Sequence, residues 1–162
     1  MENSTIKTLN IRSVRDMYIN DTKANAKNHT CNDAIISLCD MLDNNAQITC
    51  EIAKGGKVLN RGSVVECLIK LLLKDQKSAS KYSAGRVDLK LNNHDYEIKY
   101  TNSVAYASIS NKQLKEYENG DYKDLILVDT YGVYRSNTKY YKFANNGKIK
   151  GVSKVLETLV RF

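Results

Sequence analysis

The chain contains no proline and no tryptophan, and it has only two histidines among its 162 residues. His29 and His94 lie far apart in the sequence, and together they are too few to build a zinc site. No apolar run reaches the roughly 20 residues that a membrane-spanning helix needs, so we expect no membrane partner.

The cysteines show no Cys-x-x-Cys spacing, and no signal sequence precedes them. We therefore expect reduced, mostly buried thiols in a cytoplasmic protein. Abundant lysine, asparagine, isoleucine and tyrosine is a bias that an AT-rich genome produces, which favours a phage or mobile element acting in its host's cytoplasm. The cysteines are Cys31, Cys39, Cys50 and Cys67.

Basic residues exceed acidic ones by seven, and the excess is uneven. Residues 1–56 carry 6 Lys or Arg and 7 Asp or Glu, residues 57–98 carry 8 and 5, and residues 99–162 carry 11 and 6. This distribution favours a nucleic-acid partner, although a merely solvated surface would show it too. Tyrosines interleaved with basic residues could stack on bases, but we favour packing on a sheet. These residues are Tyr131, Tyr134, Tyr140 and Tyr141, with Arg135, Lys139 and Lys142.

Residues 86–91 and 94–101 both alternate between apolar and charged side chains, and this pattern predicts a β-hairpin. The link, Asn92-Asn93, tolerates the positive φ that a two-residue type I′ turn requires. With this loop, counting outward places Asp88 directly opposite Glu97.

The charged face of this hairpin brings like charges together, because Arg86 also lies opposite Lys99. Like charges across a ladder destabilise it by up to roughly 1 kcal/mol. The two carboxylates of Asp88 and Glu97, about 5 Å apart at their Cβ atoms, suit a hard divalent cation. The alternative is an ordinary half-buried hairpin with a solvated charged face.

Residues 61–73 predict a buried helix whose only interior charges are Glu66 and Lys70. Three roles are open for Glu66. It could form a capping box with Ser63, pair with Lys70 four residues later, or point over the hairpin as a third carboxylate.

Downstream, residues 110–117 predict a short helix with Gln113 and Tyr117 on one face. The apolar run 124–130 predicts an internal strand, and a further strand is expected near 104–109. Helices covering a mixed sheet give an α/β layout.

The N-terminal third predicts helices over 11–27 and 33–42 and a strand over 47–52. A helix-turn-helix is conceivable there, but the near-neutral charge favours packing or dimer contacts. We expect an apolar stripe on the second helix to form part of a twofold homodimer, and packing on the protomer's own sheet is the alternative. The stripe consists of Ile35, Leu38 and Leu42.

These motifs, in this order, resemble the PD-(D/E)xK nuclease superfamily over somewhat under half of the chain. Helix residue Glu66, hairpin residue Asp88 and the run Glu97-Ile98-Lys99 match its signature. Val87 stands where the motif often has proline.

The resemblance implies an α/β, restriction-endonuclease-like mixed central sheet flanked by helices. It also implies a single nuclease-like domain over residues 1–162, with a helical N-terminal extension at 1–56 and the nuclease core at 57–162.

The resemblance further implies a Mg²⁺ cofactor, for which Mn²⁺ substitutes, and a role for each matched residue. Lys99 would orient the attacking water or offset charge, since a pKa low enough for a base is unfavourable beside several acids. The implied catalytic residues are Glu66, Asp88, Glu97 and Lys99; the metal ligands are Asp88, Glu97, Glu66 and the Ile98 carbonyl; the substrate-binding residues are Gln113, Tyr117 and Lys112.

We therefore expect a Mg²⁺-dependent endonuclease of restriction, resolvase or nickase type that hydrolyses phosphodiester bonds in duplex or branched DNA. Two alternatives remain open: a non-catalytic nucleic-acid-binding or inhibitor protein that keeps the fold, and an RNA-directed nuclease. The intact acids and lysine argue against the non-catalytic alternative.

Overall fold

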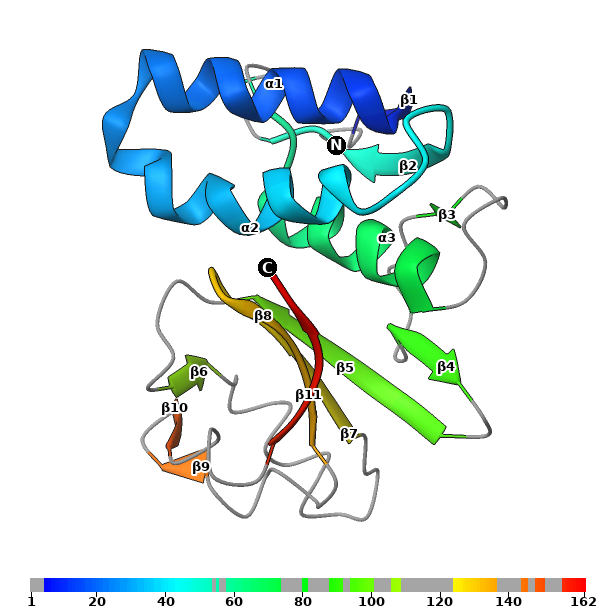
Figure 1. Cartoon of the computed structure of the whole chain (residues 1–162), viewed down its shortest axis with the longest axis vertical. Coiled ribbons are helices and arrows are strands. Elements are labelled where there is room, and N and C mark those ends of the chain that lie inside the picture. Colours follow the sequence, from blue (N-terminus) through cyan, green and yellow to red (C-terminus); the bar gives the residue numbers. More distant parts are fainter. Residues whose placement is uncertain are drawn as a thin grey trace. The chain divides into compact units, whose positions relative to one another are not determined.

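The computed structural model contains two compact units, Met1–Ala84 and Gly85–Phe162 (Figure 1). Helices together with a mixed sheet confirm the α/β class. A single domain over the whole chain stays a prediction. The structure describes residues 5–53, 55, 58–73, 80–81, 88–91, 94–100, 106–108, 124–136, 144–145, 148–150 and 156–162.

The first unit combines helices with a small sheet in the order β1-β2-β3. Strand β1 pairs antiparallel with β2, where Thr8 lies opposite Thr49, and β2 pairs parallel with β3. The predicted strand over 47–52 is confirmed by β2, whereas β1 was not expected. The elements are β1 (Ile6–Asn10), α1 (Ile11–Ala24), the 3-10 turn η1 (Ala26–Asn28), α2 (His29–Asp40), β2 (Gln47–Glu51), α3 (Arg61–Leu73) and β3 (Ser80–Lys81).

Both N-terminal helices exist, but their boundaries differ from the predicted ones. The side chain of Asn10 caps α1 by accepting a hydrogen bond from the Ser13 N–H at 2.8 Å. The helix ends before Asn25, whose extended backbone starts η1, so α1 does not continue to residue 27. Helix α2 then begins at His29, four residues before its predicted start.

The apolar stripe of α2 is buried within the single chain. Ile35 and Leu38 are fully buried and Leu42 is 6 % exposed. Helix α1 packs against α2 and buries Ile11 and Tyr18 on its own inner face. The prediction that this stripe is an exposed dimer face is therefore wrong. Helix α2 packs mainly against α1 and α3 and not on a sheet, and a homodimer through another surface stays a prediction.

A buried polar network joins α1, α2 and the start of α3. Asp21 Oδ2 accepts hydrogen bonds from Asn28 Nδ2, Asn32 Nδ2 and Arg61 Nη2 at 2.9, 2.8 and 3.0 Å. Arg61 Nε also donates to Asn32 Oδ1 at 2.8 Å, and Asn32 is fully buried. The hydrogen bond from Asn32, followed by that from Asn28 and the charge of Arg61, holds the pKa of Asp21 below its usual value. The network thus fixes where α3 begins.

The second unit contains a five-stranded sheet in the order β11-β8-β7-β5-β4 (Figure 1). Strands β5 and β7 are parallel and the other neighbours are antiparallel, so the sheet is mixed. The predicted internal strand over 124–130 is confirmed by β7. Its strands are β4 (Leu89–Leu91), β5 (His94–Tyr100), β7 (Asp124–Val128), β8 (Gly132–Ser136) and β11 (Leu156–Arg161).

A separate three-stranded sheet has the order β6-β10-β9. It consists of β6 (Tyr106–Ser108), β9 (Ala144–Asn145) and β10 (Lys148–Lys150). The strand expected near 104–109 therefore exists as β6, but it pairs with β10 rather than with the central sheet. The helix expected over 110–117 lies outside the described residues.

A tight turn joins β7 to β8 at one end of the central sheet. Asp129 is 2 % exposed, and its Oδ1 accepts hydrogen bonds from the N–H groups of Tyr131 and Gly132 at 2.7 and 3.0 Å. A Cβ atom at Gly132 would lie 2.2 Å from the Val160 carbonyl oxygen on β11, so only glycine fits there. This turn fixes the backbone at that end of the sheet.

The cysteines are all free, and three of them are buried. Burial raises the pKa of Cys39 to about 12 and that of Cys50 to about 11, so these thiols are unreactive near neutral pH. Among the described helices, none has the length and apolar character needed to cross a membrane.

Candidate functional site

The hairpin formed by β4 and β5 has the register that a two-residue loop predicts. Leu89 pairs with Tyr96 and Leu91 pairs with His94. The next position outward places Asp88 opposite Glu97, as the sequence predicted. The linking asparagines and Arg86 lie outside the described residues, so the pairing of Arg86 with Lys99 stays a prediction.

Asp88 is half-buried immediately before β4, and its side chain reaches across to β5. Its Oδ2 accepts a hydrogen bond from the Ile98 N–H at 2.9 Å. A charge-assisted bond of this kind holds the carboxylate in one orientation beside the neighbouring strand. Asp88 is therefore positioned by the backbone of the same three-residue run that contains Glu97 and Lys99.

Glu97 and Lys99 lie two residues apart on β5 and so share one face of the sheet. Glu97 is only 8 % exposed, and its Oε1 lies 3.4 Å from Lys99 Nζ. Their partners on β7 are Leu125 and Leu127, both buried. The alternative of a solvated charged face is therefore wrong at Glu97.

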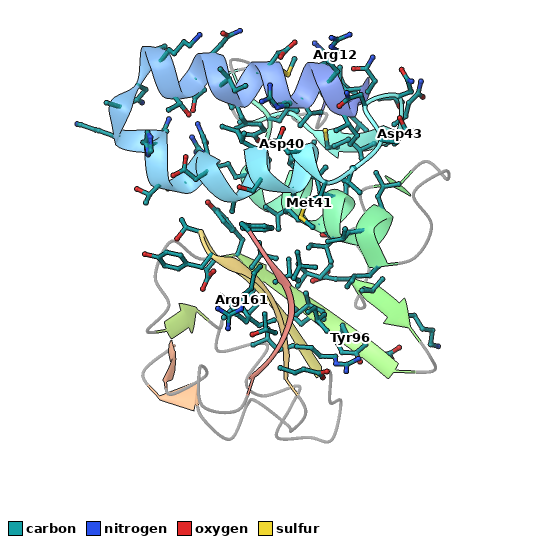
Figure 2. All side chains as sticks on the ribbon, viewed as in Figure 1. Arg12, Asp40, Met41, Asp43, Tyr96 and Arg161 are labelled. Carbon is teal, nitrogen blue, oxygen red and sulfur yellow. The ribbon has the colours of Figure 1, made fainter. Side chains whose placement is uncertain are left out.

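The opposite face of the same hairpin is apolar. Tyr96 is 5 % exposed and its cross-strand partner Leu89 is 1 % exposed. Figure 2 labels Tyr96 beside β5. Glu97 thus lies on a strand whose neighbours are buried on both faces, and a carboxylate there costs desolvation free energy that its partners must offset.

Glu66 belongs to the first unit, in the interior of α3. Its Oε1 accepts from Lys70 Nζ at 2.8 Å, and Glu66 is 8 % exposed. The capping box with Ser63 is wrong, because Asn60 caps the helix through its Oδ1, which accepts from the Ser63 N–H at 3.2 Å. The ion pair with Lys70 is therefore observed, and the role of Glu66 as a third carboxylate over the hairpin stays a prediction.

The remaining predicted residues are distributed as follows. Gln113, Tyr117 and Lys112 lie outside the described residues. The structure brings Asp88, Glu97, Ile98 and Lys99 together in the second unit, and it places Glu66 in the first unit.

The donor set of the hairpin can be tested against the chemistry of Mg²⁺. Mg²⁺ binds through one or two carboxylates, keeps several waters and takes up substrate phosphate, rather than using an all-protein cage. Asp88 and Glu97 supply two carboxylates, the oxygen donors that this cation takes as ligands. The hairpin therefore fits Mg²⁺ better than it fits zinc.

One further acid on this face was not singled out from the sequence. Asp95 Oδ1 is shielded from solvent and accepts no hydrogen bond within the described part of the chain, and Lys90 Nζ lies 3.9 Å from it. The alternation of the hairpin already placed Asp95 on the face of Glu97. That alternation was the signal that could have identified it.

No protein-family model, no curated protein and no solved structure matches the chain. Its function must therefore be inferred from the chemistry of its own residues.

Proposed function

We propose that the chain is a Mg²⁺-dependent endonuclease that hydrolyses phosphodiester bonds in DNA, with a restriction-endonuclease-like core. The observation that carries the proposal is Glu97, a buried carboxylate on an interior strand that shares its face with Lys99. Asp88, held by the Ile98 N–H, supplies a second acid, so three of the four catalytic residues that the resemblance implies, Asp88, Glu97 and Lys99, belong to this hairpin.

Each residue has a role that its surroundings support. Asp88 and Glu97 would hold Mg²⁺, which when bound activates water and offsets charge on the phosphate. The Lys99 ammonium, 20 % exposed at its side chain, is positioned to attract a non-bridging phosphate oxygen or to orient the attacking water. The fixed orientation of Asp88 means that this group needs little reorganisation on binding.

The burial of Glu97 argues for a functional role over a structural one. A buried ion pair contributes little net stability, because the cost of desolvation offsets the Coulombic attraction. An apolar residue at this position would pack beside Leu125 at no such cost. Glu97 differs from the equally buried Glu66 in lying opposite a second acid, Asp88, and a bound cation would offset the charge of both.

A cleavage assay on varied substrates tests the proposal. The parent protein is incubated with supercoiled plasmid, single-stranded DNA, four-way junctions and RNA, in Mg²⁺, Mn²⁺ or EDTA. We expect DNA cleavage with either metal and none in EDTA. RNA cleavage alone would indicate the RNA-directed alternative, and binding without cleavage of any substrate would indicate the non-catalytic one.

A matched pair of lysine variants ties the activity to the site. Lys99→Ala removes the cation beside Glu97, whereas Lys90→Ala removes a cation of the same hairpin whose side chain is 69 % exposed. We expect Lys99→Ala to lower the cleavage rate at least a hundredfold, a typical contribution of a positioned catalytic group, and Lys90→Ala to change it little. Equal effects of the two substitutions would contradict the assignment.

A further inference from the structure

The turn between β7 and β8 presents an aromatic side chain on a fixed backbone. Tyr131 is 66 % exposed, the largest exposed fraction among the exposed large apolar side chains of the described residues. Its N–H donates to Asp129 Oδ1 at 2.7 Å, and its carbonyl accepts from the Phe162 N–H at 2.9 Å. The ring therefore projects from a backbone that is held on both sides.

The side chains around Tyr131 divide into buried and exposed groups. Tyr134 on β8 is half-buried, and this burial, followed by the charge of Asp129 and a hydrogen bond to it, raises the pKa of its hydroxyl. Phe162, 37 % exposed, lies beside Tyr131 through the backbone hydrogen bond. Arg161 is exposed and pairs across the ladder with Gly132, the residue after Tyr131.

Arg161 supplies a positive charge at this aromatic surface. It makes no ion pair with any acid in the described part of the chain, unlike Arg135 on the neighbouring strand, which pairs with Glu157. Figure 2 shows Arg161 beside β11. The exposed ring of Tyr131 and the exposed Arg161 lie one ladder position apart, and they match the two parts of a nucleotide, since the ring can stack on a base and the cation can attract a phosphate.

We propose that Tyr131, Phe162 and Arg161, here called the turn platform, bind an unpaired nucleotide of single-stranded or unwound DNA. Bases inside a duplex stack on each other, so an exposed ring gains a partner only where a base is unpaired. Glycine at 132 and the buried Asp129 keep the backbone of Tyr131 in place before the ligand arrives, which lowers the entropic cost of binding.

The turn platform lies at the same end of the sheet as the lysine of the candidate site. Lys99 pairs with Leu127, and the turn begins two residues later, at Asp129. Two residues of strand extend about 7 Å, and a neighbouring strand adds about 5 Å sideways. A DNA strand on the turn platform would therefore pass within a few nucleotides of Lys99. The inference deepens the proposed function, because it names unpaired DNA as the form of substrate.

The absence of tryptophan from the chain provides a direct test. Tyr131→Trp places a single indole on the turn platform, and stacking of a base on it quenches its fluorescence. Titration with a short single-stranded oligonucleotide in EDTA, where metal-dependent cleavage does not occur, should quench the emission in proportion to binding. Binding of the oligonucleotide without quenching would overturn the proposal.

Affinity measurements by fluorescence anisotropy, also in EDTA, complete the test. Tyr131→Ala should weaken single-strand binding roughly 5- to 150-fold, the range expected for one base on one ring, while Tyr131→Phe should bind like the parent. Ile6→Ala, which removes another exposed apolar side chain, 52 % exposed in the first unit, should leave binding unchanged. Parental affinity of Tyr131→Ala would overturn the proposal, as would an equal loss on intact duplex.

The remaining outcomes separate this inference from the nuclease proposal and from other occupants. If the protein cleaves no substrate but binds single strands in a way that depends on Tyr131, the nuclease proposal would be overturned and the turn-platform proposal would be supported. If cleavage depends on Lys99 but binding is unchanged in Tyr131→Ala, the nuclease proposal would be supported and the turn-platform proposal would be overturned. Light scattering that shows a parent dimer and a Tyr131→Ala monomer would assign the surface to a second copy of the chain and overturn the inference.

Discussion

Among the residues that the structure describes, one glutamate is buried in each of the two units, and each has a lysine of its own element beside it. Glu66 on α3 and Glu97 on β5 are both 8 % exposed. The contact from Glu66 to Lys70 is 2.8 Å, a normal hydrogen-bond length, whereas that from Glu97 to Lys99 is 3.4 Å. At equal burial, the two carboxylates thus lie at different distances from the lysine of their own element.

The geometry of the two elements explains the difference. Residues four apart on a helix lie one above the other, so Lys70 can place its ammonium directly on Glu66. Residues two apart on a strand lie about 6.6 Å apart and point in the same direction, so Lys99 stands beside Glu97 rather than over it. The helical pair is therefore suited to internal stabilisation, and the strand pair is suited to holding two charges toward a third group.

The largest expected effect compares the two glutamates in catalysis. Glu97→Gln should lower DNA cleavage at least a hundredfold, because it removes one of the two proposed metal-binding carboxylates. Glu66→Gln should keep the rate within about threefold if its role is the ion pair with Lys70 alone. Cleavage rates at saturating Mg²⁺ measure both. A large loss in Glu66→Gln without a loss of stability would instead restore Glu66 as a third acid of the site.

The next effect concerns metal binding. Asp88→Asn and Glu97→Gln should each abolish or strongly weaken Mn²⁺ binding in calorimetry, while Glu66→Gln should bind Mn²⁺ like the parent. In Asp88→Asn the asparagine can still accept a hydrogen bond from the Ile98 N–H, but this bond is weaker. Because the substitution also removes the repulsion between two like charges, the two effects on stability partly cancel, and the melting temperature should stay within a few degrees of the parent. Unchanged Mn²⁺ binding in both hairpin variants would rule out the proposal that Asp88 and Glu97 bind one ion together.

A stability comparison sharpens the contrast between the pairs. Lys70→Met should cost about 2 to 4 kcal/mol, because it leaves Glu66 buried with its close cation removed, and the Glu66→Gln/Lys70→Met double variant should recover much of that loss. The corresponding coupling between Glu97 and Lys99 should be about 1 kcal/mol or less, given the longer contact. Double-mutant cycles from urea unfolding measure both couplings. Equal coupling energies would show that the strand pair is as structural as the helical one.

The smallest effect is a pH dependence that belongs to the first unit. The pKa of folded Asp21 lies below its usual value of 3.8, so its ionised form stabilises the fold fully above that value. This contribution is lost as the pH falls below about 3.8 and through the folded pKa. Asp21→Asn should flatten this acid limb in unfolding experiments between about pH 2 and 4. An unchanged acid limb would place the acid sensitivity elsewhere.

The hairpin was predictable because its signals are local. Alternation over 86–91 and 94–101, joined by two asparagines, was sufficient to fix the register that places Asp88 opposite Glu97. The start of α3 was less predictable from the sequence, since Asn60 and Ser63 are both good capping residues. The structure shows that Asn60 is the cap.

The burial of Glu97 could not be read from the hairpin alone. Alternation assigns a residue to a face, but it does not show that β5 is an interior strand. That position depends on β7, which joins β5 by a parallel pairing between distant segments and places Leu125 beside Glu97. The continuous apolar run 124–130 was the available sign that both faces of the sheet would be buried. Strands β1, β9, β10 and β11 were not predicted, because they are short or mostly exposed, and their pairings are long-range.

The parallel pairing of β5 with β7 also sets an order of events during synthesis. Glu97 pairs with Leu125, so a growing chain that has not yet exposed residues beyond 124 leaves β5 with an open edge. Bringing the two strands together across the intervening chain carries a loop-closure entropy that contacts within the hairpin do not. We therefore expect Glu97 to become buried late, so that a partly synthesised chain would form the hairpin before it forms the surroundings that bury this acid.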